Sequence, residues 1–201
     1  MKVVFVRHGK DDEKYRGGWS QLDLVPEGEE QAKKLAKHLF DNHDLYQIRR
    51  IISSDLQRTV STANYIAAEL SLQIETDQQL REMNNGDLAG MLNEIVLEKY
   101  PGLFFSSLDM DEPYPNGESP REFFLRIREW FEEFCHHHRK DSGNIAVVTH
   151  SGVINILYHL VNHIPWSNKS WPVKVSNCSI HVLNLNCMKF EIENKVDFLS
   201  E

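Results

Sequence analysis

Two histidines in this chain each follow a short apolar segment, and both have neighbours suited to phosphate chemistry. His8 lies in Val6-Arg7-His8-Gly9 after an apolar run, and His150 directly follows Ala146–Thr149. If these runs are buried strands, both imidazoles stand at strand ends, where open α/β sheets bind ligands. The guanidinium of Arg7 can grip phosphate oxygens in a bidentate manner. The residues alone therefore indicate a phosphate site.

Further groups around these histidines support a phosphate site without a metal. Arg58 falls in the first turn of a predicted helix, and the helices after Ser54 and Ser151 can each add backbone N–H groups. The zinc patterns HxH and HExxH and paired cysteines do not occur around His8 or His150. The chain also has neither a GxSxG elbow nor a GxxxxGK[ST] loop. We therefore expect no metal and no cofactor.

The hydrophobic pattern alternates between strands and helices, which predicts an α/β fold with a mostly parallel central sheet and helices on both faces. The predicted strands are Lys2–Val6, Ile48–Ser53, Gln73–Thr76, Asn144–Thr149, Val173–Leu185 and Lys189–Glu193. The predicted helices run from Pro26 to about Asn42, from Ser54 to about Leu70, over Leu92–Tyr100, from Ser119 to about His138, and over Val153–Val161.

Two predicted helices open with sequences typical of a capping box. These are Ser54-Asp55-Leu56-Gln57 and Ser119-Pro120-Arg121-Glu122, the second with proline at the first helical position. The segment before Ser119 has no clear period, and we expect a lid or substrate segment at residues 91–117. Without repeats or linkers, residues 1–201 are expected to form one domain.

Composition narrows the possible partners and location. The net charge of −8 argues against a broad nucleic-acid or anionic-membrane surface, so positive potential must be local. No run approaches the length of a membrane span, and the first segment does not read as a signal peptide. The three cysteines show no CxxC spacing, which favours a reduced, cytoplasmic setting. The sequence leaves the oligomeric state open.

The chain resembles the histidine phosphatase superfamily, the phosphoglycerate mutase-like proteins, in six blocks along nearly its whole length. The signature block is Arg7-His8-Gly9. The other matching segments, in order, are Gly18-Trp19-Ser20 with Leu24, Glu27-Gly28 and Gln31-Ala32; Ser53–Thr59 with Thr62-Ala63; Leu80-Arg81-Glu82 with Gly86 and Gly90; Pro115–Ser119 with Arg126; and Thr149–Gly152 with Asn177–Ile180. The resemblance implies a three-layer phosphoglycerate mutase-like sandwich.

The resemblance also implies a role for each matching site residue. His8 is the nucleophile and becomes phosphohistidine, and Glu82 protonates the leaving alkoxide and then activates water. Arg7, Arg58 and His150 hold the phosphoryl oxygens and stabilise the transition state. Ser20 and Ser151 are candidate substrate-binding residues. Glu13 and Glu118 are weaker candidates for the acid.

The chain departs from the family pattern after the nucleophile. Members often carry a phosphate-contacting asparagine there, whereas this stretch, residues 10–16, has none. Lys14 and Arg16 are the candidates to replace it. The run His136–His138 falls at a helix end, where cationic groups suit the helix dipole; a metal role there is the lesser alternative.

These patterns predict a metal-independent phosphomonoesterase that acts on a small phosphorylated metabolite. The alternatives are a cofactor-dependent phosphoglycerate mutase and a non-catalytic phospho-ligand binder. Mutases of the family carry a basic arginine pair in the segment after the acid block, whereas residues 92–117 contain Lys99 as their only basic residue. Charge complementarity therefore favours a phosphatase.

Overall fold

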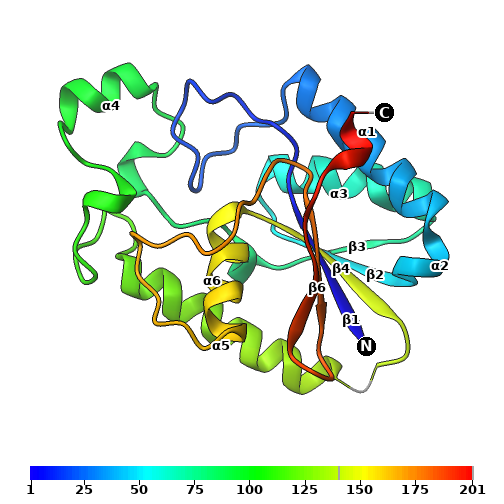
Figure 1. Cartoon of the computed structure of the whole chain (residues 1–201). Helices are drawn as coiled ribbons and strands as arrows, with labels where there is room; N and C mark the ends of the chain where they lie inside the picture. The colour runs from blue at the N-terminus through cyan, green and yellow to red at the C-terminus, as the bar shows by residue number, and fades with distance from the viewer. Residues whose placement is uncertain (140, 201) are drawn as a thin grey trace.

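A six-stranded sheet forms the centre of the protein, which we describe from a computed structural model over residues 1–139 and 141–200 (Figure 1). The strands lie in the order β3-β2-β4-β1-β5-β6. Their bounds are β1 Lys2–Arg7, β2 Ile48–Ser53, β3 Ile74–Thr76, β4 Asn144–Thr149, β5 Ile180–Asn184 and β6 Lys189–Lys195.

The sheet is mostly parallel, as the sequence predicts. β1 pairs with β4, β4 with β2, and β2 with β3, all in parallel, whereas β5 and β6 add an antiparallel edge. The predicted strand Val173–Leu185 is wrong in its first half, because only Ile180–Asn184 joins the sheet. Cys178 has a φ of 53°, and its N–H donates to the carbonyls of Arg7 and His8. This stretch therefore turns around the end of β1 instead of extending.

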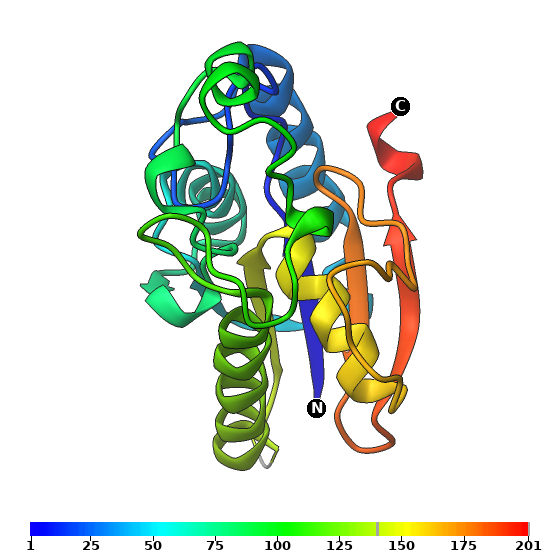
Figure 2. The ribbon, with the colours of Figure 1, turned by 90° about the vertical axis from the view of Figure 1, so that its left-hand side faces the viewer.

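Helices cover both faces of the sheet (Figures 1 and 2). α1 (Pro26–Asp41) and α3 (Gln57–Leu70) pack on one face, in an apolar cluster with β1, β2 and β4. α5 (Pro120–His138) and α6 (Ser151–Val161) pack on the other face around a second cluster. Two short helices, α2 (His43–Tyr46) and α4 (Asn93–Lys99), complete this set. The expected α/β architecture is confirmed.

One of the two predicted capping boxes is present. At the start of α5, Ser119 accepts a hydrogen bond from the Glu122 N–H, and the Glu122 carboxylate accepts one from the Ser119 N–H. The box predicted at Ser54 is wrong, because α3 begins only at Gln57 and its N-cap residue, Leu56, makes no side-chain cap. The Ser54 hydroxyl instead contacts His150.

The segments that follow the parallel strands gather at one edge of the sheet. The loop after β1 crosses to the chain around α4, where Tyr15 forms a β-bridge with Leu92 (Figure 1). The segment expected as a lid, residues 91–117, contains α4 and a single 3₁₀ turn at Phe105–Ser107. Across residues 1–139 and 141–200, no helix has the length and apolar character needed to cross a membrane.

Gly28 allows α1 to pack directly against the loop after His8. A Cβ atom at Gly28 would lie 2.0 Å from the Lys10 carbonyl oxygen, which is backbone and cannot move aside cheaply. We expect Gly28→Ala to lower the free energy of unfolding by about 1–3 kcal/mol through overpacking, measured by urea denaturation. Gly17→Ala is the matched control, because a Cβ there meets nothing within 4 Å. Equal stability of both variants would contradict this packing.

Candidate active site

The parallel pairing of β1 with β4 brings the two strand-end histidines together. Arg7 lies opposite Thr149 in the register, and the His8 N–H donates to the Thr149 carbonyl at 3.0 Å. His150 is the N-cap residue of α6. The two imidazole rings meet edge to face, with centroids 5.1 Å apart. The expected juxtaposition of His8 and His150 therefore occurs at the carboxyl edge of the sheet.

Arg58, the second residue of α3, joins both histidines through a guanidinium that is 2% exposed. Its Nε donates to His8 Nε2 and its Nη2 to His150 Nδ1, both at 3.3 Å. Its remaining donors reach the carbonyl oxygens of Gly18 at 2.8 Å and Ser20 at 3.0 Å. Ser20 therefore orients Arg58 from the side of the loop.

These contacts determine where each imidazole carries its proton. A guanidinium only donates, so His8 Nε2 and His150 Nδ1 act as acceptors. The other nitrogen of His8, Nδ1, lies 2.7 Å from the Gly9 carbonyl oxygen and therefore donates to it. His150 Nε2 lies 3.0 Å from the Ser54 hydroxyl. Each ring is a neutral tautomer, and the lone pair of His8 is on Nε2.

Burial and neighbouring charge keep both histidines neutral. Burial, followed by the charges of Arg58 and Arg7, lowers the pKa of His8 well below its usual range. Burial and Arg58 likewise lower the pKa of His150, with smaller contributions from His8 and Arg7. A neutral imidazole is the nucleophilic form, so His8 has the protonation state that a nucleophile needs at neutral pH.

Arg7 has a buried donor with no acceptor among the described residues. Its Nη1 donates to the Val175 carbonyl at 2.8 Å, whereas its Nε is buried with no hydrogen-bond partner in residues 1–139 and 141–200. Burial lowers the pKa of Arg7 and Arg58, and the carboxylates of Asp11 and Glu82 act in the opposite direction. Arginine stays charged under such shifts, so two guanidinium groups flank His8.

Glu82 lies across this site, against the N-terminus of α6. Its Oε2 accepts from the Gly152 N–H at 3.0 Å and from the Ser151 hydroxyl at 3.4 Å. A Cβ atom at Gly152 would lie 2.2 Å from Glu82 Oε1, so glycine is required for this approach. The predicted residue Ser151 thus contacts the candidate acid.

Two side chains fix the main chain at Glu82 by hydrogen bonds. The Glu82 carbonyl accepts from Trp19 Nε1 at 2.8 Å and from Arg126 Nη2 at 3.2 Å. Arg126 in turn forms a two-bonded ion pair with Glu118, whose Oε2 also accepts from the Asn84 N–H. Glu118 is therefore a structural anchor of the Glu82 loop.

A cavity of about 260 Å³ borders Glu82 and Gly152 on one side and Gly18 on the other. Phe105 and Tyr114 from the expected lid segment contribute to its wall. Arg16 also lines it, whereas Lys14, the other candidate to replace the family asparagine, is exposed and does not line it.

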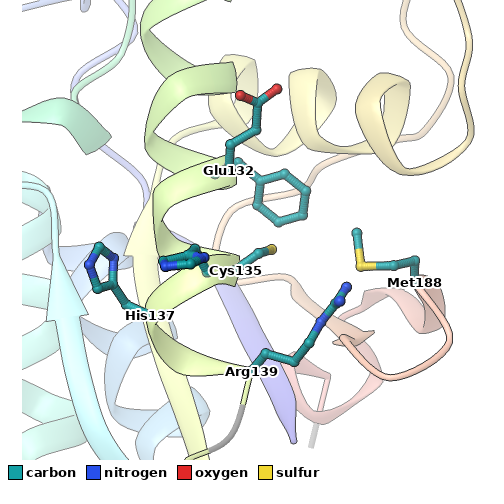
Figure 3. A pocket seen from close by; sticks show the side chains of 7 residues that line it. Glu132, Cys135, His137, Arg139 and Met188 are labelled. Carbon is teal, nitrogen blue, oxygen red and sulfur yellow. The ribbon is translucent and has the colours of Figure 1, made fainter.

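The histidine run at the end of α5 lies beside a separate cavity of about 610 Å³. Cys135 and Arg139 point toward Met188, whereas His137 points away from it (Figure 3). Within residues 1–139 and 141–200, no three histidine, cysteine or acidic side chains are grouped as a metal site would require. The placement at a helix C-terminus agrees with the dipole interpretation.

Several contributors to the site were not identified from the sequence. The sequence predicts a helix cap at Ser54, which instead contacts His150. Trp19 and Arg126 belong to the matching blocks, but no pattern tied them to the Glu82 main chain. Trp171, in the cavity wall, lies in a stretch without periodicity and gave no signal.

Comparison with known proteins shows the family. The family profile of the histidine phosphatase superfamily (branch 1) matches residues 3–197. The chain belongs to this superfamily. It is 32% identical to phosphoglycerate mutase-like protein 4 of Arabidopsis thaliana, over 92% of this chain and 79% of that protein. It is 30% identical to phosphoserine phosphatase 1 of Hydrogenobacter thermophilus, over 92% and 87% respectively. As a member of this superfamily, the protein is an enzyme of the phosphatase class.

Solved structures of this histidine phosphatase's relatives share its fold. The alpha-ribazole phosphatase of Shigella flexneri superposes with a TM-score of 0.82 at 22% identity, covering 97% of this chain and 96% of that one. A mycobacterial glucosyl-3-phosphoglycerate phosphatase gives a TM-score of 0.76 at 24% identity, covering 96% and 98%. These likenesses confirm the phosphoglycerate mutase-like fold.

The lowered pKa of His150 gives a prediction about stability and pH. Because the unfolded chain binds a proton near pH 6.5 and the folded chain does so only at lower pH, stability falls as pH drops below about 6.5. The variant His150→Gln lacks this titrating group, so it does not show this contribution to the loss of stability at low pH. We expect the stability advantage of the wild type over the variant to shrink by up to about 1.4 kcal/mol per pH unit, in urea denaturation at pH 7, 6 and 5. A constant difference would contradict a buried neutral His150.

Proposed function

We propose that this protein is a metal-independent phosphomonoesterase that forms a phosphohistidine intermediate at His8 on a small phosphorylated metabolite. The observation that carries the proposal is the state of His8: its Nδ1 donates to the Gly9 carbonyl, so the lone pair of Nε2 faces Arg58 in a buried site. Two guanidinium groups supply the positive charge that a phosphoryl group requires.

In the first step, His8 Nε2 attacks phosphorus and the bond from phosphorus to the alkoxide oxygen breaks. Arg7 and Arg58 bind the phosphoryl oxygens and stabilise the charge that spreads over them, with His150 beside them. Glu82 gives its proton to the leaving alkoxide, which departs as the alcohol. The enzyme then carries a phosphoryl group on His8.

In the second step, water attacks the phosphohistidine. Glu82, now a carboxylate, accepts a proton from the water, and the phosphorus–nitrogen bond breaks. The electron pair returns to His8 Nε2, and inorganic phosphate is released. Both steps use one acid–base group and one cluster of cations, so the cycle regenerates the starting protonation states.

The relatives support this function over the alternatives. Proteins similar along most of the chain are named as phosphatases of phosphoserine, of alpha-ribazole phosphate and of glucosyl-3-phosphoglycerate, which are small phosphorylated compounds. Other relatives are named as phosphoglycerate mutases, and this activity is the second candidate. Residues 92–117 contain Lys99 as their single basic residue, so this segment lacks the arginine pair that the mutases carry there. The acid Glu82 beside His8, Arg58 and His150 argues against a mere binding protein.

We expect His8→Ala to abolish hydrolysis of p-nitrophenyl phosphate, because it removes the nucleophile. The assay is run in EDTA, which inhibits contaminating metal-dependent phosphatases. We expect the wild type to stay fully active in EDTA, because its arginines supply the charge that a metal would otherwise provide. Acid-labile, base-stable ³²P labelling of the quenched wild-type enzyme reports the phosphohistidine. His43→Ala, which changes an exposed histidine on α2, is the matched control. Near-wild-type turnover by folded His8→Ala would refute the mechanism.

The role of Glu82 predicts a dependence on the leaving group. An alkyl phosphate leaves as a strongly basic alkoxide and needs a proton, whereas nitrophenolate barely needs one. Glu82→Gln should therefore slow an alkyl phosphate by at least about 100-fold, and p-nitrophenyl phosphate much less. The phosphoenzyme should also persist longer in a quench-flow measurement. Equal slowing of both substrates with an intermediate of unchanged lifetime would assign the acid role elsewhere.

A further inference from the structure

The cavity beside Glu82 contains a cation that the mechanism above does not use. Arg16 lines this cavity, and Arg16 Nε is buried without a hydrogen-bond partner in residues 1–139 and 141–200. We propose that Arg16 binds a carboxylate carried by the alcohol part of the substrate rather than replacing the family's phosphate-contacting asparagine, so that the preferred substrates are small phosphomonoesters of hydroxy acids. This inference rests on the proposed phosphatase function and specifies its substrate class.

Arg16 differs from the other arginines around the Glu82 loop because no carboxylate of residues 1–139 and 141–200 pairs with it. Arg81 pairs with Asp55 through two hydrogen bonds, and Arg126 pairs with Glu118 in the same way. No side chain of the described residues accepts a hydrogen bond from Arg16, whose guanidinium lies 5.2 Å above the ring of Phe104. Its donors are therefore available to an anion from outside the chain.

The backbone holds Arg16 firmly at this place. The Arg16 N–H donates to the Met91 carbonyl at 2.9 Å, and the Arg16 carbonyl accepts from the Gly90 N–H at 2.8 Å. The neighbouring bridge between Tyr15 and Leu92 continues this pairing. A cation on a fixed backbone can bind an anion with less loss of conformational entropy than one on a free loop.

The cavity connects Arg16 to the reacting groups. Glu82 and Gly152 line it, as does Gly18, whose carbonyl accepts from Arg58. The cavity therefore lies where the leaving alcohol would sit when phosphate occupies the cation cluster. Arg16 is the single cationic side chain among its lining residues within the described chain.

The neighbours of the guanidinium favour one carboxylate rather than a second phosphate. Phe105, Tyr114 and Trp171 form apolar walls of the same cavity, and no second cation lines it among the described residues. Burial raises the pKa of Tyr114 to about 12, while Arg16 acts in the opposite direction, which agrees with a positive charge near the phenol. A guanidinium matches the planar carboxylate with two parallel hydrogen bonds, and apolar surroundings strengthen them.

The test uses two pairs of substrates that differ in the carboxylate. 3-Phosphoglycerate is compared with glycerol 3-phosphate, and O-phosphoserine with phosphoethanolamine. We expect the wild type to prefer the acid of each pair. Arg16→Met should lower kcat/KM for the acids by about 10- to 100-fold, mainly through KM, as expected for a lost charge-assisted hydrogen bond. The partners without the carboxylate should change by less than about 3-fold.

Two further variants and one neutral probe separate the possible failures. Arg16→Lys should recover part of the preference for the acids. The control is Arg49→Met, which removes one exposed positive charge near the start of β2 and should leave the preference for the acids unchanged. Hydrolysis of p-nitrophenyl phosphate reports the chemistry alone. If the wild type hydrolyses this probe but shows no preference within the pairs, or if Arg16→Met slows both members equally, the carboxylate site is overturned. A wild type that hydrolyses no phosphomonoester overturns the phosphatase function, and the inference with it.

Discussion

Placing the charge of Arg58 in the interior is the constraint around which the site is organised. Removing a guanidinium from water costs several kcal/mol unless its donors are paired. The chain meets this cost with groups from residues 8–20 and from His150: two imidazole nitrogens, the carbonyls of Gly18 and Ser20, and the carboxylate of Asp11 at 3.5 Å. The same contacts force both histidines to accept rather than donate at the shared atoms. One buried cation thus positions the loop after β1, sets the tautomers of His8 and His150, and contributes to the positive potential of the candidate site.

The candidate acid, Glu82, is positioned by hydrogen bonds to the main-chain carbonyls of its turn. Arg126 donates to the carbonyls of Gln79, Arg81 and Glu82, and Trp19 adds a fourth bond to this turn. Arg81 lies against the Trp19 ring at 4.6 Å and pairs with Asp55. Within residues 1–139 and 141–200, the carboxyl of Glu82 is hydrogen-bonded only to the start of α6 and to the N–H of its own neighbour, Met83. The support behind the turn thus fixes the Glu82 main chain, while no charged side chain of these residues is hydrogen-bonded to its carboxylate.

Much of this arrangement could be predicted from the sequence, because it follows from periodicity and strand ends. The run Asn144–Thr149 is apolar and bounded by polar residues, and its strand has the predicted limits. His8, Arg58 and His150 meet because parallel strands end at one edge of the sheet. The failures occur where tertiary contacts outweigh local signals. Ser54 has the spacing of a cap but contacts His150 instead, and Val173–Ser179 has strand residues but turns around β1. Trp171 reaches the cavity from an aperiodic loop, which no local rule could place.

The position of β1 has a consequence for how the protein assembles. β1 precedes the other five strands of the sheet, yet its two neighbours are β4 and β5, which begin at Asn144 and Ile180. During synthesis on a ribosome, this strand, apolar from Val3 to Val6, must therefore stay unpaired until β4 and β5 have emerged. Pairings of such long sequence separation form slowly, because a long loop must close first. Helices α1 and α3 with β2 can associate earlier, so we expect His8 to become ordered among the last parts of the fold, together with His150.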